Sequence, residues 1–90
     1  MKEETVRELR GFVLREFLPG EPPESLENTT PLISGGVIDS IGTLKLVGFL
    51  EERFGIQAEA HEIDEENLDS IELMASFVES KQSGAGDNAG

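Results

Sequence analysis

Hydrophobic residues near the start of the chain recur at a helical spacing. Val6, Leu9, Val13 and Phe17 stand three or four positions apart, and charged side chains occupy many of the positions between them. Because residues at this spacing share one face of an α-helix, the pattern predicts an amphipathic helix. A cluster of prolines with a glycine at residues 19–23 ends this helix.

The segment that follows is typical of a long loop. Up to Asp39 it is rich in proline, glycine, serine, threonine and asparagine. Its apolar residues Leu26, Leu32 and Ile33 are expected to anchor it to the core. Loops of this length are uncommon in compact domains, and they tend to be functional.

A second helix is predicted over Ser40–Phe54. Asp39 or Ser40 can cap its start, and Gly55 stands at the position where helices commonly end on a glycine. A rotation of about 100° per residue divides its side chains between two faces. The face expected to join the core contains Leu46, Val47, Leu50 and Phe54. The opposite face contains Ile41, Leu44, Lys45, Gly48 and Glu52.

The rest of the chain predicts one helical turn and a last helix. Residues 55–62 indicate an extended connection, and residues 64–68 a single turn. Asp69 and Glu72 have the spacing of a capping box at the start of the last helix. Residues 82–90 have no apolar periodicity and are expected to be disordered. The apolar residues of the last helix are Ile71, Leu73, Met74, Ala75, Phe77 and Val78.

Together these elements predict an all-α fold. We expect a small bundle of three main helices plus one short helix, with a long loop between the first and second helices. The 90 residues suit one domain. This domain is expected over residues 1–81, followed by a tail at residues 82–90.

Charge limits what this domain can bind. The chain has 19 acidic and 7 basic residues, which gives a net charge of −12. Nucleic-acid binding relies on clustered lysine and arginine, so the composition argues against nucleic acid and favours basic protein partners, although the acids can also serve solubility alone. No signal segment and no run of membrane-spanning length is present, which predicts a cytoplasmic protein with no membrane partner. We expect a monomer.

Several kinds of chemistry find no support in the sequence. There is no cysteine, and therefore no thiolate nucleophile, disulfide or cysteine-bound metal. His61 is the only histidine and stands in a polar stretch, so a serine-hydrolase triad is not expected. The acidic run at residues 64–67 lacks the alternating oxygen ligands and central glycine of a calcium-binding loop. We expect no metal site and no catalytic residue.

The most informative segment is Gly35–Ile41. Two glycines and two apolar residues lead there to Asp39-Ser40 at a predicted helix start. Taken alone, Asp-Ser before a helix is an ordinary N-cap. A serine at this place can also carry a phosphate, because the helix dipole and unpaired backbone N–H groups favour negative charge. The long loop before it and the apolar residues on the outer face of the helix favour this second interpretation.

The ordered set of motifs resembles the acyl carrier protein family. That family has Asp-Ser-Leu at the start of its second helix, and Asp39-Ser40-Ile41 stands there in this chain. Residues 32–40 are similar to the family's preceding loop, with an apolar pair, a glycine, a hydrophobic residue and Asp-Ser. Residues 46–55 and 67–71 are similar to the end of its second helix and the start of its last helix, so the likeness extends over about residues 3–80.

The resemblance implies a carrier rather than an enzyme. A separate phosphopantetheinyl transferase would move 4′-phosphopantetheine from coenzyme A onto the hydroxyl of Ser40. The thiol of this covalent arm would hold acyl or aminoacyl groups as thioesters. Asp39 would act as helix cap, as transferase contact, or as both. Further partners would be a loading enzyme (an adenylating ligase or an acyltransferase) and downstream synthase or tailoring enzymes.

The chain departs from fatty-acid carriers just after the serine. Those carriers often have acidic residues at the positions of Gly42 and Lys45, and a bulky apolar residue at the position of Gly48. The chain therefore looks more like a free-standing carrier of natural-product biosynthesis, of the polyketide or nonribosomal peptide type. The face expected to contact partner enzymes consists of Ile41, Leu44, Lys45 and Gly48.

Two alternatives stay open. One is a carrier of fatty-acid synthesis. The other is an unmodified helical adaptor that keeps the bundle and binds partners only through residues 40–54.

Overall fold

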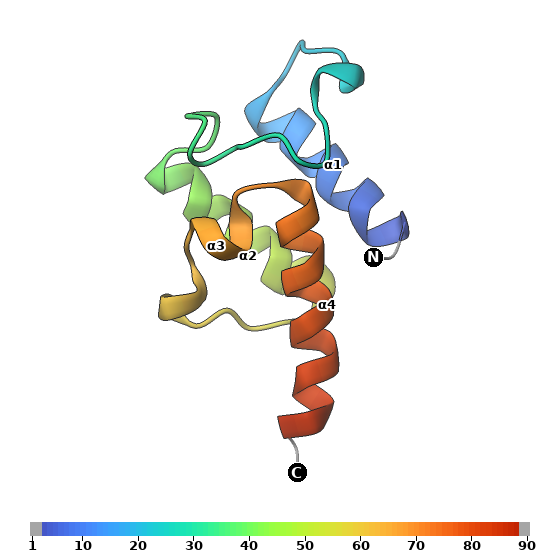
Figure 1. The fold of residues 1–90 in the computed structure, drawn as a ribbon, viewed down its shortest axis with the longest axis vertical. Helices are drawn as coiled ribbons and strands as arrows, with labels where there is room; N and C mark the ends of the chain where they lie inside the picture. Colours follow the sequence, from blue (N-terminus) through green and yellow to red (C-terminus); the bar gives the residue numbers. More distant parts are fainter. Residues whose placement is uncertain (1–2, 89–90) are drawn as a thin grey trace.

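The protein is a small bundle of helices (Figure 1). The computed structural model describes residues 3–88, with side chains through Ser83, and no β-strand is present in this part of the chain. The predicted all-α class, with three long helices and one short helix, is confirmed. In chain order the elements are α1 (Glu3–Phe17), the 3₁₀ turn η1 (Pro23–Ser25), α2 (Ser40–Phe54), the 3₁₀ turn η2 (Ala60–Glu62), α3 (Glu65–Leu68) and α4 (Ile71–Asn88).

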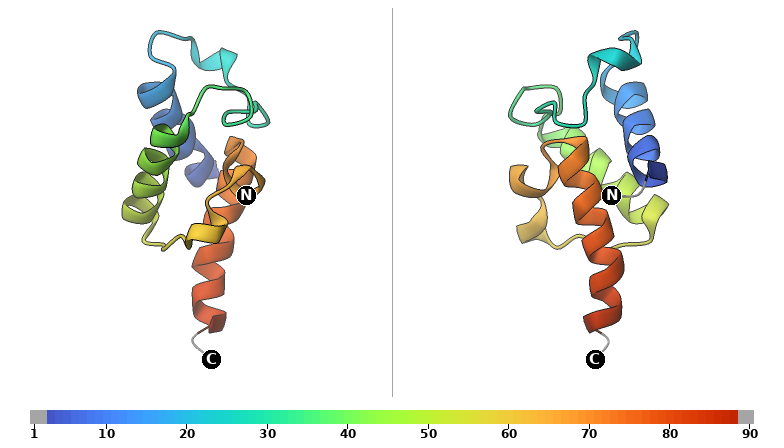
Figure 2. Two further views of the ribbon diagram at one scale, coloured as in Figure 1. Left: turned by 90° about the vertical axis from the view of Figure 1, so that its left-hand side faces the viewer. Right: turned by 45° about the vertical axis from the view of Figure 1, so that its right-hand side comes forward.

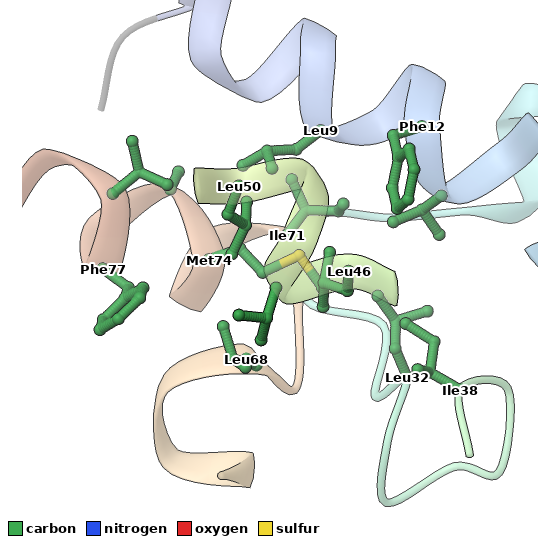
Figure 3. Packing of buried hydrophobic residues seen from close by; sticks show 14 of the residues in the cluster. Leu9, Phe12, Leu32, Ile38, Leu46, Leu50, Leu68, Ile71, Met74 and Phe77 are labelled. Atoms are coloured by element: carbon green, nitrogen blue, oxygen red, sulfur yellow. The ribbon is translucent and has the colours of Figure 1, made fainter. Parts of the chain in front are cut away.

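One apolar core lies where the helices meet (Figure 3). Met74 of α4 lies among Leu46 and Leu50 of α2 and Leu68 of α3, and all four are completely buried. Burial of such apolar surface is the main favourable contribution to folding. Leu73, which the sequence analysis grouped with the apolar stripe of α4, is instead 38% exposed. The other buried apolar residues are Leu9, Phe12, Val13, Leu26, Leu32, Ile38, Val47, Ile71, Ala75, Phe77 and Val78.

Helix α2 has the bounds that the sequence predicts. At its end Gly55 adopts φ 67° and ψ 33°, and its N–H donates to Glu51 O. This left-handed conformation favours glycine, which has no Cβ to clash with the backbone. On the predicted inner face, Leu46, Val47 and Leu50 are buried, whereas Phe54 is half-buried.

Aromatic rings fill the space between α1 and α2. The rings of Phe12 and Phe49 stack with their centroids 4.0 Å apart. Phe17 meets Phe12 edge-on at 5.8 Å, and Phe54 meets Phe49 edge-on at 6.0 Å. Edge-on and offset contacts between rings add to the gain from area burial alone. The Phe12–Phe49 stack therefore joins the two helices, and each edge-on pair supports it from within one helix.

The loop between α1 and α2 follows a fixed path. Leu26 and Leu32 are buried, as expected for its apolar anchors. Asn28 joins the loop to two helices, because its side-chain Oδ1 accepts from Arg10 of α1 at 3.1 Å and its backbone O accepts from the N–H of Glu72 of α4 at 2.9 Å. The long loop is therefore part of the folded structure.

Helix α4 projects beyond the body of the bundle (Figures 1 and 2). Lys81 Nζ donates to Glu62 Oε1 at 2.8 Å, and Gln82 Nε2 donates to Phe54 O at 3.2 Å. The helical backbone continues to Asn88. The sequence predicts a disordered tail from Gln82 onward, so the helix is longer than expected. Extending an anchored helix requires no new nucleus, which favours these additional turns. Residues 89–90 of the expected tail lie outside the described residues.

The acidic surface is expected to make the fold sensitive to ions. Lys45–Glu16, Arg53–Glu8 and Lys81–Glu62 form ion pairs. All three keep some contact with solvent, where an ion pair contributes little to stability. Unscreened repulsion within a chain of net charge −12 therefore destabilises the compact state.

We expect added salt or a divalent cation to raise the melting temperature by screening this repulsion. The expected rise is about 4–8 °C, which corresponds to about 1 kcal/mol for a domain of this size. Melting followed by circular dichroism at about 10 mM and about 150 mM salt measures the effect over a large change in Debye length. Equal melting temperatures at both concentrations would contradict the expectation.

Candidate functional site

Ser40 is the first residue of α2 and is exposed. No residue in the described part of the chain forms a hydrogen bond with its hydroxyl. The side chain is therefore accessible to another protein and is not used to hold the fold together.

Asp39 supplies the cap that the first turn of α2 needs. Its Oδ1 accepts from the N–H of Gly42 at 2.7 Å. Its backbone O accepts from the N–H of Thr43 at 2.8 Å and from Thr43 Oγ1 at 2.9 Å. This is the geometry of an N-cap, and it settles which of the two predicted residues caps the helix. Because Asp39 caps the helix, the hydroxyl of Ser40 is not needed for capping.

A second Asp-Ser pair, Asp69-Ser70, precedes α4, and there the roles are reversed. Ser70 is buried, and its Oγ accepts from the N–H of Leu73 at 3.2 Å, so Ser70 is the side-chain cap. The predicted capping box of Asp69 with Glu72 is wrong, because the Asp69 carboxylate binds the loop instead. The same dipeptide thus leaves a free hydroxyl at α2 and a buried one at α4.

The Asp69 carboxylate holds the loop that precedes Ser40. Its Oδ1 accepts from the N–H groups of Ile33 and Ser34 at 2.7 and 2.8 Å, and its Oδ2 accepts from Ser34 Oγ at 2.7 Å. Partial burial acts to raise the pKa of Asp69, but the hydrogen bonds from Ser34 and Ile33 outweigh it and hold the pKa below its ordinary value. Ionised Asp69 therefore stabilises the fold above about pH 4, and this contribution is lost as the pH falls through the lowered pKa.

The predicted partner face lies beside Ser40 on the outside of α2. Ile41 is 73% exposed and Leu44 is 66% exposed. Gly48 is exposed as well, and a Cβ built on it would meet nothing within 4 Å. Lys45 belongs to the same exposed face, but its Nζ lies 3.5 Å from Glu16 Oε1 of α1. The positive charge expected there is therefore partly balanced by a neighbour that the sequence analysis did not identify.

Gly42 belongs to the interior, although it follows Ser40 by only two positions. It is buried, and a Cβ built on it would lie 2.8 Å from Phe17 Cε1, 3.1 Å from Ile38 Cγ2 and 3.2 Å from Asp39 Oδ1. Fatty-acid carriers often have an acidic residue at this position. In this fold an acidic residue there would force the Phe17 side chain at the end of α1 to move.

His61 is not paired with Ser40. It is exposed on η2. In the part of the chain that the structure describes, no hydrogen bond joins the imidazole of His61 to the hydroxyl of Ser40, so the two are not arranged as a nucleophile and its base.

Among the described side chains, which extend through Ser83, no group of three or more histidine, aspartate or glutamate residues is arranged so that it could hold a metal ion. No helix within residues 3–88 is both long enough and apolar enough to cross a membrane.

Comparisons with known proteins give no family for this chain. No protein-family model matches it, and neither do the curated proteins or the solved structures at a significant level. The resemblance to acyl carrier proteins therefore rests on the chain's own motifs and stays a prediction.

Proposed function

We propose that the protein is a carrier whose Ser40 receives 4′-phosphopantetheine and which then presents acyl or aminoacyl groups to partner enzymes. The observation that supports this proposal most is the free, exposed hydroxyl of Ser40 at the first residue of a capped helix of 15 residues. The motif Asp39-Ser40-Ile41, within a chain that resembles acyl carrier proteins over most of its length, gives further support.

The first turn of α2 suits a serine-bound phosphate. Backbone N–H groups at a helix start have no intrahelical acceptor, and together with the helix dipole they favour a negative charge. The side chain of Asp39 accepts from one of these N–H groups, that of Gly42, and Ser40 beside it is exposed. When bound, the arm supplies a terminal thiol as the attachment point for cargo.

The attachment forms one bond and breaks one. The Ser40 oxygen bonds to the phosphorus of 4′-phosphopantetheine, and the pyrophosphate bond of coenzyme A breaks to release adenosine 3′,5′-bisphosphate. No described residue of this chain accepts the hydroxyl proton. The base that takes the proton would therefore belong to the phosphopantetheinyl transferase. In this scheme the protein is a substrate of other enzymes and has no catalytic residue of its own.

The pathway we favour is natural-product biosynthesis of the polyketide or nonribosomal peptide type. An adenylating ligase or an acyltransferase would load the arm, and synthase or tailoring enzymes would use the cargo. The support is the outer face of α2 beside Ser40, where Lys45 and Gly48 stand at positions that fatty-acid carriers fill differently. Exposed Ile41 and Leu44 would also suit an unmodified adaptor, which makes covalent modification the deciding property.

Incubation with a broad-specificity phosphopantetheinyl transferase and coenzyme A is expected to add one phosphopantetheinyl group to the intact mass. Ser40→Ala should abolish this addition while helical circular dichroism persists, because the Ser40 side chain makes no contact that holds the fold. Intact-protein mass spectrometry followed by peptide mapping checks both the number of groups and their position.

Ser76→Ala is the matched control, because Ser76 is an exposed serine on another helix. This variant should be modified at the rate of the original protein. Modification that survives in Ser40→Ala would move the site elsewhere. A complete absence of modification in the original protein would favour the adaptor.

A further inference from the structure

A single side chain, Asp69, fixes the loop before Ser40 to the start of α4. Three donors meet its carboxylate within 2.7–2.8 Å: the N–H groups of Ile33 and Ser34 and the hydroxyl of Ser34. The partners are 35 or 36 positions away from it in the chain. The contact is therefore a tertiary one that joins two distant segments.

Leu32 connects this contact to the start of α2. Its N–H donates to the backbone O of Asp69 at 2.7 Å, and its own O accepts from the N–H groups of Val37 and Ile38 at 2.8 and 2.9 Å. Leu32 and Ile38 are both buried, and Ile38 is followed directly by Asp39, the N-cap of α2. Short backbone hydrogen bonds thus lead from Asp69, just before α4, to Ile38, the residue before the N-cap of α2.

The chemistry of the contact calls for a carboxylate. All three partners are donors, and both oxygens of Asp69 accept. Hydrogen bonds to an ionised acceptor are stronger than those between neutral groups. An asparagine offers only one acceptor oxygen, and its NH₂ group would meet a donor. Asparagine at residue 69 would therefore keep part of the contact, and alanine would keep none of the side-chain part.

We propose that Asp69 is a positioning residue for Ser40. By holding residues 32–38 on α4, its carboxylate fixes the place and direction in which the first turn of α2 presents the serine hydroxyl to the modifying enzyme. A misplacement of about 1 Å can lower the rate of a group transfer by about 100-fold. The inference rests on the proposed function, since it assigns Asp69 a part in the modification of Ser40.

Steady-state kinetics of phosphopantetheine transfer test this role. The substrates are the original protein, Asp69→Asn and Asp69→Ala, at a temperature where circular dichroism shows each fully folded. Ser70→Ala is the matched control, because it removes the side-chain cap of the same helix start without touching the loop contacts. We expect kcat/KM to fall by about tenfold for Asp69→Ala and by less for Asp69→Asn, with Ser70→Ala unchanged.

A second measurement does not depend on the modification. Amide hydrogen exchange of residues 33–38 is expected to be faster in Asp69→Ala than in the original protein, while the amides in the middle of α2 exchange as before. Unchanged exchange at residues 33–38 would overturn the inference. It would also be overturned if Asp69→Ala kept the original kcat/KM, or if Ser70→Ala lost as much. No transfer to the original protein would instead contradict the proposed function, and the exchange data would still show whether Asp69 holds the loop.

Discussion

Gly42→Asp is expected to lower the free energy of unfolding by about 3 kcal/mol or more. Two effects add up. A Cβ at this position would lie 2.8 Å from Phe17 Cε1 and 3.1 Å from Ile38 Cγ2, so the Phe17 ring must move, and overpacking of this kind costs about 1–3 kcal/mol. The new carboxylate would also lie close to that of Asp39, whose Oδ1 is 3.2 Å from the built Cβ, so two like charges would repel each other. Chemical denaturation followed by circular dichroism measures the loss.

Gly48→Asp is the matched control for this prediction. Gly48 is on the same helix but exposed, and a Cβ there meets nothing within 4 Å, so the same substitution should change the stability by no more than about 0.5 kcal/mol. If the two variants were equally stable, the close packing of α1 on the first turn of α2 would be wrong. The comparison also shows whether a variant with an acidic residue near Ser40 still folds.

Ile41→Ala and Leu44→Ala are each expected to lower kcat/KM for loading of the modified protein by about tenfold, a change equivalent to about 1.4 kcal/mol. Both side chains are more than half exposed and lie beside Ser40 on one face of α2, so a partner that docks there buries them. Because neither belongs to the core, the melting temperature should stay unchanged. Steady-state loading by the cognate enzyme, with circular dichroism as folding control, measures both quantities.

Leu73→Ala serves as the control for general surface hydrophobicity. Leu73 is also an exposed leucine, but it belongs to α4. Its replacement should leave loading unchanged. Equal losses for Leu73→Ala and Leu44→Ala would show that the outer face of α2 is not the docking surface.

Lys45→Glu extends the same experiment to partner choice. It replaces the cation of the Lys45–Glu16 pair by an anion, so two carboxylates would meet at the edge of the docking face. Repulsion or attraction at the rim of an interface selects between partners. We expect weaker loading by the native enzyme and better transfer by fatty-acid synthase enzymes. Unchanged rates with both would place partner selection in the loop or in α4.

The sequence was sufficient to predict the helices because their signals are local. The bounds of α2 follow from a cap at Asp39, an apolar face at helical spacing and a left-handed Gly55, and the structure agrees with them. The exposed Ser40 and the outer face of α2 follow from the same helical periodicity. Each of these features depends on residues within one or two turns of each other.

The parts that could not be predicted depend on contacts between distant segments. The Asp69 carboxylate has the spacing of a capping residue, and only the folded loop shows that Ile33 and Ser34 use it. The helical pattern assigns Gly42 to neither face of α2, and only the folded structure shows that Phe17 of α1 lies against it. The one sequence signal that could have suggested a different role for Asp69 is the repeated Asp-Ser pair, since Ser70 alone can cap α4.

The projecting end of α4 makes the molecule convenient to tether. It lies away from the start of α2 in every view of the bundle (Figures 1 and 2), so a surface or a second protein attached there leaves Ser40 accessible. The long axis of the molecule is 45 Å. A flexible linker spans about 5–6 Å times the square root of its residue number, so roughly 55–80 residues would let an enzyme fused to this end reach Ser40 on the same molecule. Such a fusion would raise the local concentration of the enzyme to about the millimolar range, where even a weak docking face is occupied.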